Sequence, residues 1–119
     1  MRNENVILEK SKSFAIRVVR LYKYLSDEKK ENVLSKQLLR SGTSVGANIR
    51  EAIQGQSKKD FVSKMSVSLK EATETEYWLE LLYETEYLSE EEYASISEDC
   101  KEVVKLLTAI VKSSRESLK

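Results

Sequence analysis

No proline occurs among the 119 residues of this chain, and only three glycines interrupt it. Proline removes a backbone hydrogen-bond donor and breaks helices, so its absence leaves long helices available along the whole sequence. Hydrophobic residues make up 40% of the chain and charged residues 34%, which suits an apolar core under a charged surface. The composition favours an all-α fold, and the length fits a single domain over residues 1–119.

Apolar residues recur every three or four positions in four segments, as they do along the buried face of a helix. In the first segment they are Phe14, Val18, Leu21 and Leu25, after a looser start at Val6 to Leu8. In the second they are Leu34, Leu38, Gly42, Val45, Ile49 and Ala52, and this segment ends near Gln54 and Gly55. The third, ending near Glu86, has Phe61, Met65, Leu69, Ala72, Leu79 and Tyr83, and the fourth has Tyr93, Ile96, Cys100, Val103, Leu107 and Ile110.

Polar residues between these segments supply helix starts and turns. Ser57 and Ser89 are each followed within three positions by an acidic residue, which is the spacing of a capping box. Ser26, Asp27 and the charged run after them provide turn and capping chemistry between the first two segments. Because the connections are short, successive helices should be antiparallel, which predicts an up-down-up-down four-helix bundle.

The sequence has no segment typical of a membrane anchor or a signal peptide. Apolar runs such as YWL and AIV are three residues long, whereas a membrane span needs about 20. Cys100 is the only cysteine and cannot form an internal disulfide, which fits a reducing compartment. We therefore expect a cytoplasmic protein with no membrane partner.

The net charge is zero, but the two halves of the chain have opposite charge. Lys and Arg outnumber Asp and Glu by 15 to 7 from Met1 to Lys70, and acidic residues outnumber basic ones by 13 to 5 from Glu71 to Lys119. Two explanations are open. The basic and acidic helices pair within the bundle or between subunits, or the basic half contacts an anionic partner.

The third segment has more apolar surface than one core requires. Apolar side chains surround most of its circumference, namely Tyr77, Trp78, Leu79, Leu81, Leu82 and Tyr83. One core buries one stripe of a helix, so the remainder predicts either contact with another subunit or a locally wide core.

The stretch QLLRSGTSVGANIREA, from Gln37 to Ala52, combines small, polar and apolar positions on one helix. Gly42 and Gly46 are four residues apart, which removes side-chain bulk along one flank and allows another backbone to approach closely. Ser44 and Asn48 border the predicted core, so their polar atoms need partners if they are buried. We expect them in a hydrogen-bonded contact between helices or subunits.

Three runs resemble a known protein family: Ser44 to Ala52, Ser57 to Phe61, and Leu69 to Leu79. In order and spacing they are similar to the bacterial four-helix bundle proteins related to those encoded in intervening sequences of large-subunit ribosomal RNA genes, which are labelled as S23-type ribosomal proteins. The likeness covers nearly the whole chain. Together with Gly42, the candidate motif, helix-packing or interface residues are Ser44, Gly46, Asn48, Glu51, Glu71, Glu74, Tyr77 and Trp78.

The resemblance implies an antiparallel bundle that assembles as a homo-oligomer, with a five-membered ring favoured. It brings no catalytic role. A related branch of the family is an accessory protein that works with a reverse transcriptase and binds nucleic acid through a basic surface. The resemblance therefore also implies RNA or DNA as a possible partner.

The residues themselves offer little for catalysis. The chain has no histidine, which excludes Ser-His and Cys-His nucleophile pairs and the Glu-x-x-His ligands of di-iron bundles. It has no Gly-rich phosphate loop, and Cys100 is at an inward position where it should pack as a small hydrophobe. Carboxylates that could gather around a hard cation, against the alternative of ion pairs with basic residues, are Glu51, Glu71, Glu74 and Glu76.

We therefore expect no enzyme, cofactor or resident metal, and a homo-oligomeric helical scaffold or adaptor. The alternative is a nucleic-acid-associated accessory protein, because clustered cations release counterions from phosphates. Its candidate contacts are Arg17, Arg20, Lys23, Arg40, Arg50, Lys58 and Lys59. A carboxylate-metal enzyme is a third possibility.

Overall fold

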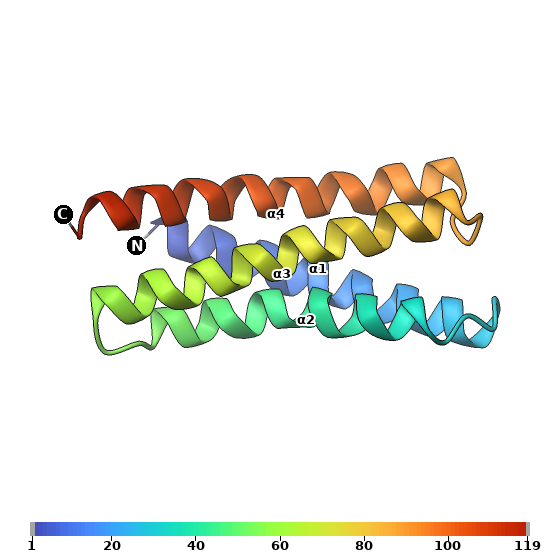
Figure 1. Ribbon diagram of the computed structural model, residues 1–119, viewed down its shortest axis with the longest axis horizontal. Helices are drawn as coiled ribbons and strands as arrows, with labels where there is room; N and C mark the ends of the chain where they lie inside the picture. The colour runs from blue at the N-terminus through green and yellow to red at the C-terminus, as the bar shows by residue number, and fades with distance from the viewer. Residues whose placement is uncertain (1, 119) are drawn as a thin grey trace.

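The computed structural model describes residues 2–118, which form four α-helices and no strand. The helices are α1 (Arg2–Asp27), α2 (Leu34–Ile53), α3 (Lys58–Glu84) and α4 (Glu90–Glu116). They alternate in direction along a molecule measuring 48 × 21 × 20 Å, and each lies beside its neighbour in sequence (Figure 1). This arrangement confirms the predicted all-α, up-down-up-down four-helix bundle.

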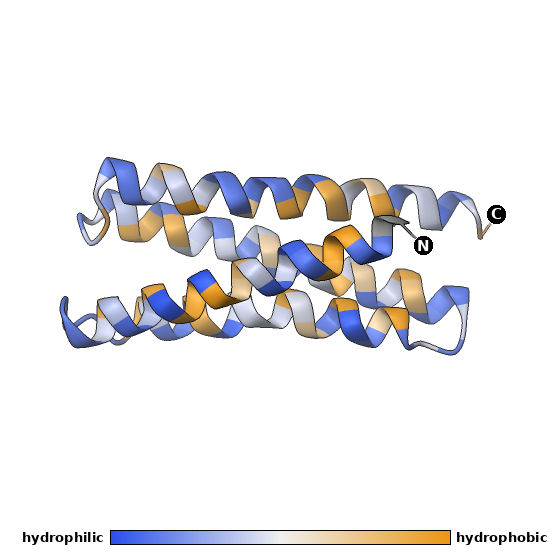
Figure 2. Cartoon of the chain, turned by 180° about the vertical axis from the view of Figure 1, so that it is seen from behind, coloured by the Kyte–Doolittle hydropathy of each residue, from blue (hydrophilic) through white to orange (hydrophobic). Residues whose placement is uncertain are grey.

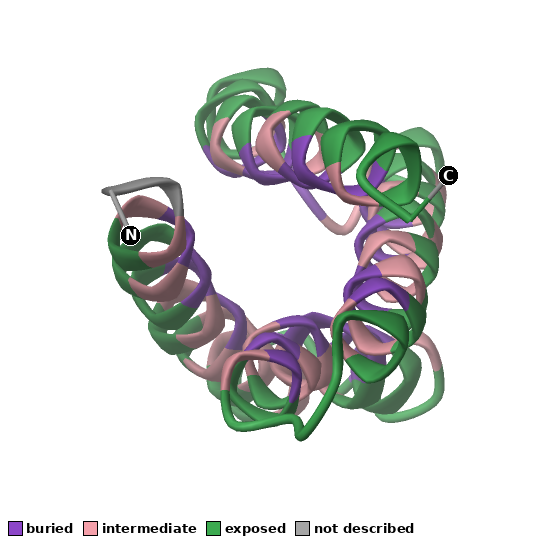
Figure 3. Cartoon of the chain, turned by 90° about the vertical axis from the view of Figure 1, so that its left-hand side faces the viewer, coloured by how far each residue is buried: buried purple, intermediate pink, exposed green. Residues whose placement is uncertain are grey.

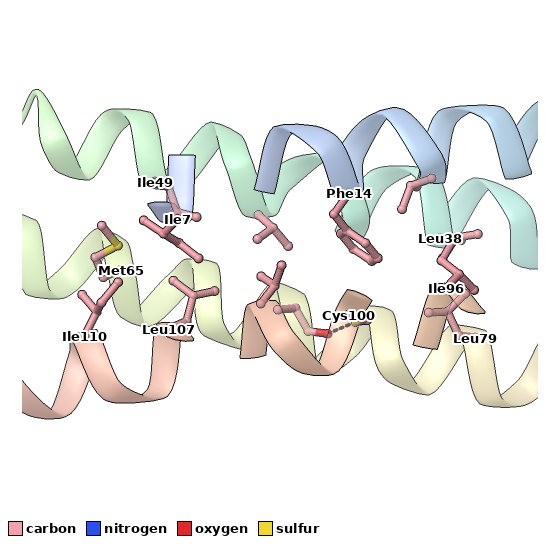
Figure 4. Close-up of a cluster of buried hydrophobic side chains, with 14 of the residues drawn as sticks. Ile7, Phe14, Leu38, Ile49, Met65, Leu79, Ile96, Cys100, Leu107 and Ile110 are labelled. Carbon is pink, nitrogen blue, oxygen red and sulfur yellow. Dashed lines mark hydrogen bonds between the residues drawn. The ribbon is translucent and has the colours of Figure 1, made fainter. Parts of the chain in front are cut away.

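Each helix turns an apolar face toward the axis of the bundle (Figure 2). All four helices contribute to one continuous core (Figure 4). The fully buried large side chains include Phe14, Leu38, Ile49, Met65, Leu79 and Leu107. The spacing in the first, second and fourth segments predicted most of these positions, because a three-four repeat of apolar residues marks the buried face directly.

The buried row of α3 differs from the predicted one. Met65, Ala72 and Leu79 are buried as expected, but the predicted positions of Phe61, Leu69 and Tyr83 are only half-buried. The fully buried row instead includes two hydroxyl residues, Ser68 and Thr75. Both are polar, so a pattern of apolar residues cannot reveal them.

Those hydroxyl groups join α3 to α2. The Thr75 hydroxyl donates to the Ser41 hydroxyl at 2.8 Å, and the Ser68 hydroxyl donates to the carbonyl oxygen of Val45 at 2.8 Å. All three side chains are buried, so each bond replaces water that the folded chain excludes. Because hydroxyl side chains are small, the two helices approach closely along this line.

On its other flank, α2 packs closely against α1 at the two glycines. A β-carbon added at Gly42 would lie 2.7 and 2.8 Å from the two γ-carbons of Val18, closer than packed carbon atoms tolerate. A β-carbon at Gly46 would lie 3.4 Å from the Ser11 hydroxyl, which is an ordinary contact. Close helix approach therefore requires glycine at position 42 and leaves room for a small side chain at position 46.

The contact between α1 and α4, called here the α1–α4 seam, is the least extensive of the four helix contacts. Viewed from the end that holds both termini, the beginning of α1 stands apart from the end of α4 (Figure 3). Ion pairs link the two helices across the seam, from Lys10 to Glu102 and from Arg17 to Asp99. These side chains are 37–46% exposed, so water and salt screen their attraction.

The helix starts at Ser57 and Ser89 are confirmed. The Ser57 hydroxyl accepts from the backbone N–H of Asp60, and Ser89 forms a complete capping box with Glu92. The turn and capping chemistry expected between α1 and α2 is confirmed in part. The Ser26 hydroxyl donates to Asn32 within the turn, and the cap of α2 comes from Glu31 in the charged run after Asp27. The five-residue connection after α3 begins sooner than predicted, because that helix ends at Glu84 rather than near Glu86.

The buried carboxylate of Glu31 caps the beginning of helix α2. Its two oxygens accept from the backbone N–H groups of Val33 at 3.3 Å, Leu34 at 3.0 Å and Ser35 at 2.7 Å. Burial acts to raise the pKa of the Glu31 carboxyl, but the hydrogen bonds from Leu34, Ser35 and Val33 together outweigh it and hold that pKa below its ordinary value. The carboxylate also stabilises the positive end of the helix.

The first prediction compares alanine at the two α2 glycines. Gly42→Ala should destabilise the fold by about 1–3 kcal/mol, because the new methyl group overlaps buried Val18. Gly46→Ala should be neutral or stabilise it by up to about 1 kcal/mol through helix propensity. Urea unfolding monitored by circular dichroism gives both values. Equal losses at the two positions would contradict the close approach at Gly42.

The second prediction concerns Glu31. At neutral pH, Glu31→Gln should lower the free energy of unfolding by about 1–2 kcal/mol, as loss of a cap does. Because the folded-state pKa is depressed, the wild-type advantage is present above the ordinary pKa of 4.5 and is lost as pH falls through the lower folded value. Unfolding curves between neutral and acidic pH measure this. Glu28→Gln, an exposed carboxylate in the same turn, is the control and should change little.

Candidate interaction surface

An Arg-carboxylate cluster connects the outer sides of α2 and α3. Arg40 donates from Nη1 to Glu71 Oε2 at 3.1 Å and from Nη2 to Glu74 Oε2. The indole Nε1 of Trp78 donates to the same oxygen of Glu74 at 3.2 Å. Residues 71, 74 and 78 follow one another at spacings of three and four, so α3 presents all three toward Arg40. The cluster orients Trp78, and the two carboxylates share the single positive charge of Arg40.

Tyr77 extends this cluster into solvent. Its ring packs edge-to-face on Trp78, with centroids 5.2 Å apart and an interplanar angle of 63°. Tyr77 is nonetheless 54% exposed, and Val67 on the same helix is 42% exposed. On the opposite layer of the bundle, Ile16 of α1 is 44% exposed. Large apolar side chains are therefore open to solvent on both layers.

The other candidate packing residues have local partners. The Ser44 hydroxyl donates to the carbonyl oxygen of Arg40 at 2.7 Å, and Asn48 Nδ2 donates to the carbonyl oxygen of Ser44 at 2.9 Å. Both bonds lie within α2, whereas the buried hydroxyl bonds between α2 and α3 involve Ser41 and Ser68 with their partners. Glu51 forms an ion pair with Lys64 of α3 at 3.1 Å.

Three of the carboxylates considered for a metal ion form ion pairs with basic side chains instead. Glu71 and Glu74 pair with Arg40, and Glu51 pairs with Lys64. Among the described residues, no three His, Cys, Asp or Glu side chains gather in a way that could hold a metal ion. Cys100 is buried in the core, where its Sγ donates to the carbonyl oxygen of Ala72 at 3.6 Å (Figure 4). Burial raises the pKa of this thiol to about 12, so the nucleophilic thiolate is scarce at neutral pH.

The candidate nucleic-acid contacts divide into paired and unpaired cations. Arg17 donates to Asp99 Oδ2 at 2.6 Å and to Ser95 Oγ at 2.9 Å, and Arg40 belongs to the Arg-carboxylate cluster. The remaining five are exposed and form no ion pair within the described part of the chain: Arg20, Lys23, Arg50, Lys58 and Lys59.

These unpaired cations do not form one patch. Arg20 and Lys23 lie toward the α1–α2 turn, whereas Arg50, Lys58 and Lys59 flank the α2–α3 turn at the opposite end of the bundle (Figure 1). The second group contains three cations within ten residues of sequence and is the larger one. We call Arg50, Lys58 and Lys59 the basic turn.

Charge is also unequal between the two layers of the bundle. Helices α1 and α2 contain nine Lys or Arg and four Asp or Glu, whereas α3 and α4 contain eight and thirteen. The α1–α2 layer is therefore positive and the α3–α4 layer negative. Ion pairs of Lys10, Arg17 and Arg40 with carboxylates of α3 and α4 offset part of this imbalance.

No described helix combines the length and apolar character needed to cross a membrane.

No curated protein matches this chain. A crystal structure of a protein of unknown function from the S23 ribosomal protein family of Bacteroides thetaiotaomicron is similar to it. The two share 59% sequence identity with a TM-score of 0.91, over 92% of this chain and 98% of the other. Residues 3–109 match the family described as 23S rRNA-intervening sequence protein, and the chain belongs to that family.

Proposed function

We propose that this protein is a non-enzymatic cytoplasmic scaffold or adaptor whose working form is a homo-oligomer, with a ring of five copies favoured. The observation that supports assembly most directly is the exposed Tyr77 beside Trp78 and Arg40 on the outer side of α3. Tyr, Trp and Arg are the residues that contribute most to protein interfaces, because each combines a large apolar area with a polar group. Burial of the Tyr77 ring in an interface would be favourable, because it would remove apolar surface from water.

The two layers of the bundle suggest how copies would meet. A positive α1–α2 layer with exposed Ile16 is complementary to a negative α3–α4 layer with exposed Tyr77 and Val67. Contact between different faces of identical subunits is heterologous, and it forms a ring when the rotation between copies closes. The number five comes from the family resemblance. A ring would then present the same charged ends repeatedly to a partner, which is the proposed scaffold function.

The third prediction tests assembly. Light scattering at micromolar concentration should give several times the 13.7 kDa of one chain. Tyr77→Ser should weaken assembly by about 2 kcal/mol or more, about thirtyfold in the dissociation constant, if Tyr77 is an interface anchor.

Val33→Ser is the matched control. Val33 is 73% exposed, more than Tyr77, but it lies in the α1–α2 turn away from the proposed contact. Its replacement should leave the mass unchanged. A monomeric wild-type protein would refute the assembly proposal. Equal effects of both substitutions would show that Tyr77 is not an interface anchor.

The second candidate function is binding of RNA or DNA. It is supported by the basic turn, whose three cations are exposed and unpaired, and a ring would repeat them once per subunit. Arg17 and Arg40 do not support it, because their guanidinium groups are engaged by Asp99, Glu71 and Glu74. Binding through surface cations alone would depend on salt more than on sequence.

The fourth prediction separates the two candidate functions. If the basic turn binds duplex DNA, the affinity should fall by roughly 0.9 log units per log unit of salt for each phosphate neutralised. Lys58→Glu with Lys59→Glu should abolish binding, whereas Lys23→Glu at the other end should leave most of it. Fluorescence anisotropy with labelled RNA and DNA measures both. Absence of binding by the wild-type protein at low ionic strength would rule out the nucleic-acid function and leave the scaffold function.

A further inference from the structure

One end of the bundle contains an open hollow of about 610 Å³, called here the end hollow. It lies where the α2–α3 turn meets the beginning of α1 and the end of α4, the end that faces the viewer in Figure 3. The beginning of α1 and the end of α4 stand apart at this end (Figure 3), and residues of both helices line the hollow. Ligand pockets in proteins span about 300–1,000 Å³, and the end hollow falls within that range.

The inner wall of the end hollow is apolar. It includes Ile53, Phe61 and Ile110 from three different helices. Ile110 and Val62 have the largest exposed fractions of the buried hydrophobic core, at 9% and 8%, and both line this hollow. Ile53 and Phe61 are only half-buried beside them. Ile53 and Phe61 therefore leave apolar surface in contact with water at this end, and covering that surface is favourable.

The rim of the end hollow consists mainly of hydroxyl groups. Ser57, Ser113 and Ser114 line it, and no hydrogen bond donated by their side chains is formed among the described residues. The charged side chains at the rim, Lys58 and Glu4, have opposite signs. The rim therefore offers hydrogen bonds without an excess of either charge, so it favours an uncharged polar group over an anion or a cation.

We propose that the end hollow is a binding site for an uncharged amphipathic molecule, with an alkyl chain against Ile53, Phe61 and Ile110 and a hydroxyl head group at the serine rim. Burial of the chain covers the apolar wall, and the head group exchanges hydrogen bonds with hydroxyls that can both donate and accept. This site is separate from the Arg-carboxylate cluster and adjoins the basic turn, with which it shares Lys58. The proposal does not depend on oligomerisation or on nucleic-acid binding.

The test uses 1-decanol as the probe, below its solubility limit, with decanoate and decylammonium as charged analogues of equal chain length. Ligand-observed NMR and calorimetry should show saturable binding of decanol to the full-length protein and weaker binding of both ions. Ala109 lines the hollow and is exposed, so Ala109→Trp should fill the space and weaken decanol binding by about tenfold or more. Thr108→Trp is the control, because Thr108 is the exposed residue before Ala109 and does not line the hollow. This substitution should leave decanol binding intact.

Three results would overturn the proposal. They are no saturable binding of decanol, undiminished binding by Ala109→Trp, or equal binding of decanol and its charged analogues. Circular dichroism establishes that each variant is folded. If Ala109→Trp is not folded, Ser113→Trp on the rim provides the same steric test with the same expected loss of binding.

Discussion

The close approach of α1 to α2 at Gly42 is the constraint on which the rest of the bundle depends. The γ-carbons of Val18 occupy the space that any side chain at position 42 would need. On the other flank of α2, Ser41 and the carbonyl oxygen of Val45 receive hydrogen bonds from α3. Helix α2 is therefore fixed on both sides, by the absence of a side chain against α1 and by buried hydroxyl groups against α3. Small residues at these positions determine the distances between three of the four helices.

The remaining edge, the α1–α4 seam, has a different chemistry. Screened ion pairs at Lys10 and Arg17 cross it, and the helices separate toward the end that holds the termini (Figure 3). The end hollow lies at this end of the bundle and exposes apolar groups. The charge difference between the positive α1–α2 layer and the negative α3–α4 layer has a separate origin, in the residue content of the helices. The proposed ligand site uses the open end, whereas the proposed assembly contact uses the outer sides of the helices.

The sequence predicted features that local rules determine and missed those that depend on distant partners. The caps at Ser57 and Ser89 follow from three-residue spacing, and most of the core follows from helical periodicity. Ser68 and Thr75 were missed because a buried hydroxyl is favourable only when another helix supplies its partner. Arg17 is 82 residues from Asp99 in sequence, so composition alone could not show that its charge is paired.

Native-state hydrogen exchange followed residue by residue tests this account most directly. If Gly42 and the buried hydroxyls fix α2, amides in the middle of α2 and in the facing part of α3 should exchange slowest, near the rate set by global unfolding. Amides at the beginning of α1 and the end of α4 should exchange through smaller openings, and added salt should accelerate them by screening the ion pairs of the seam. Slowest exchange in α4, or opening of α2 before α1 and α4, would contradict it.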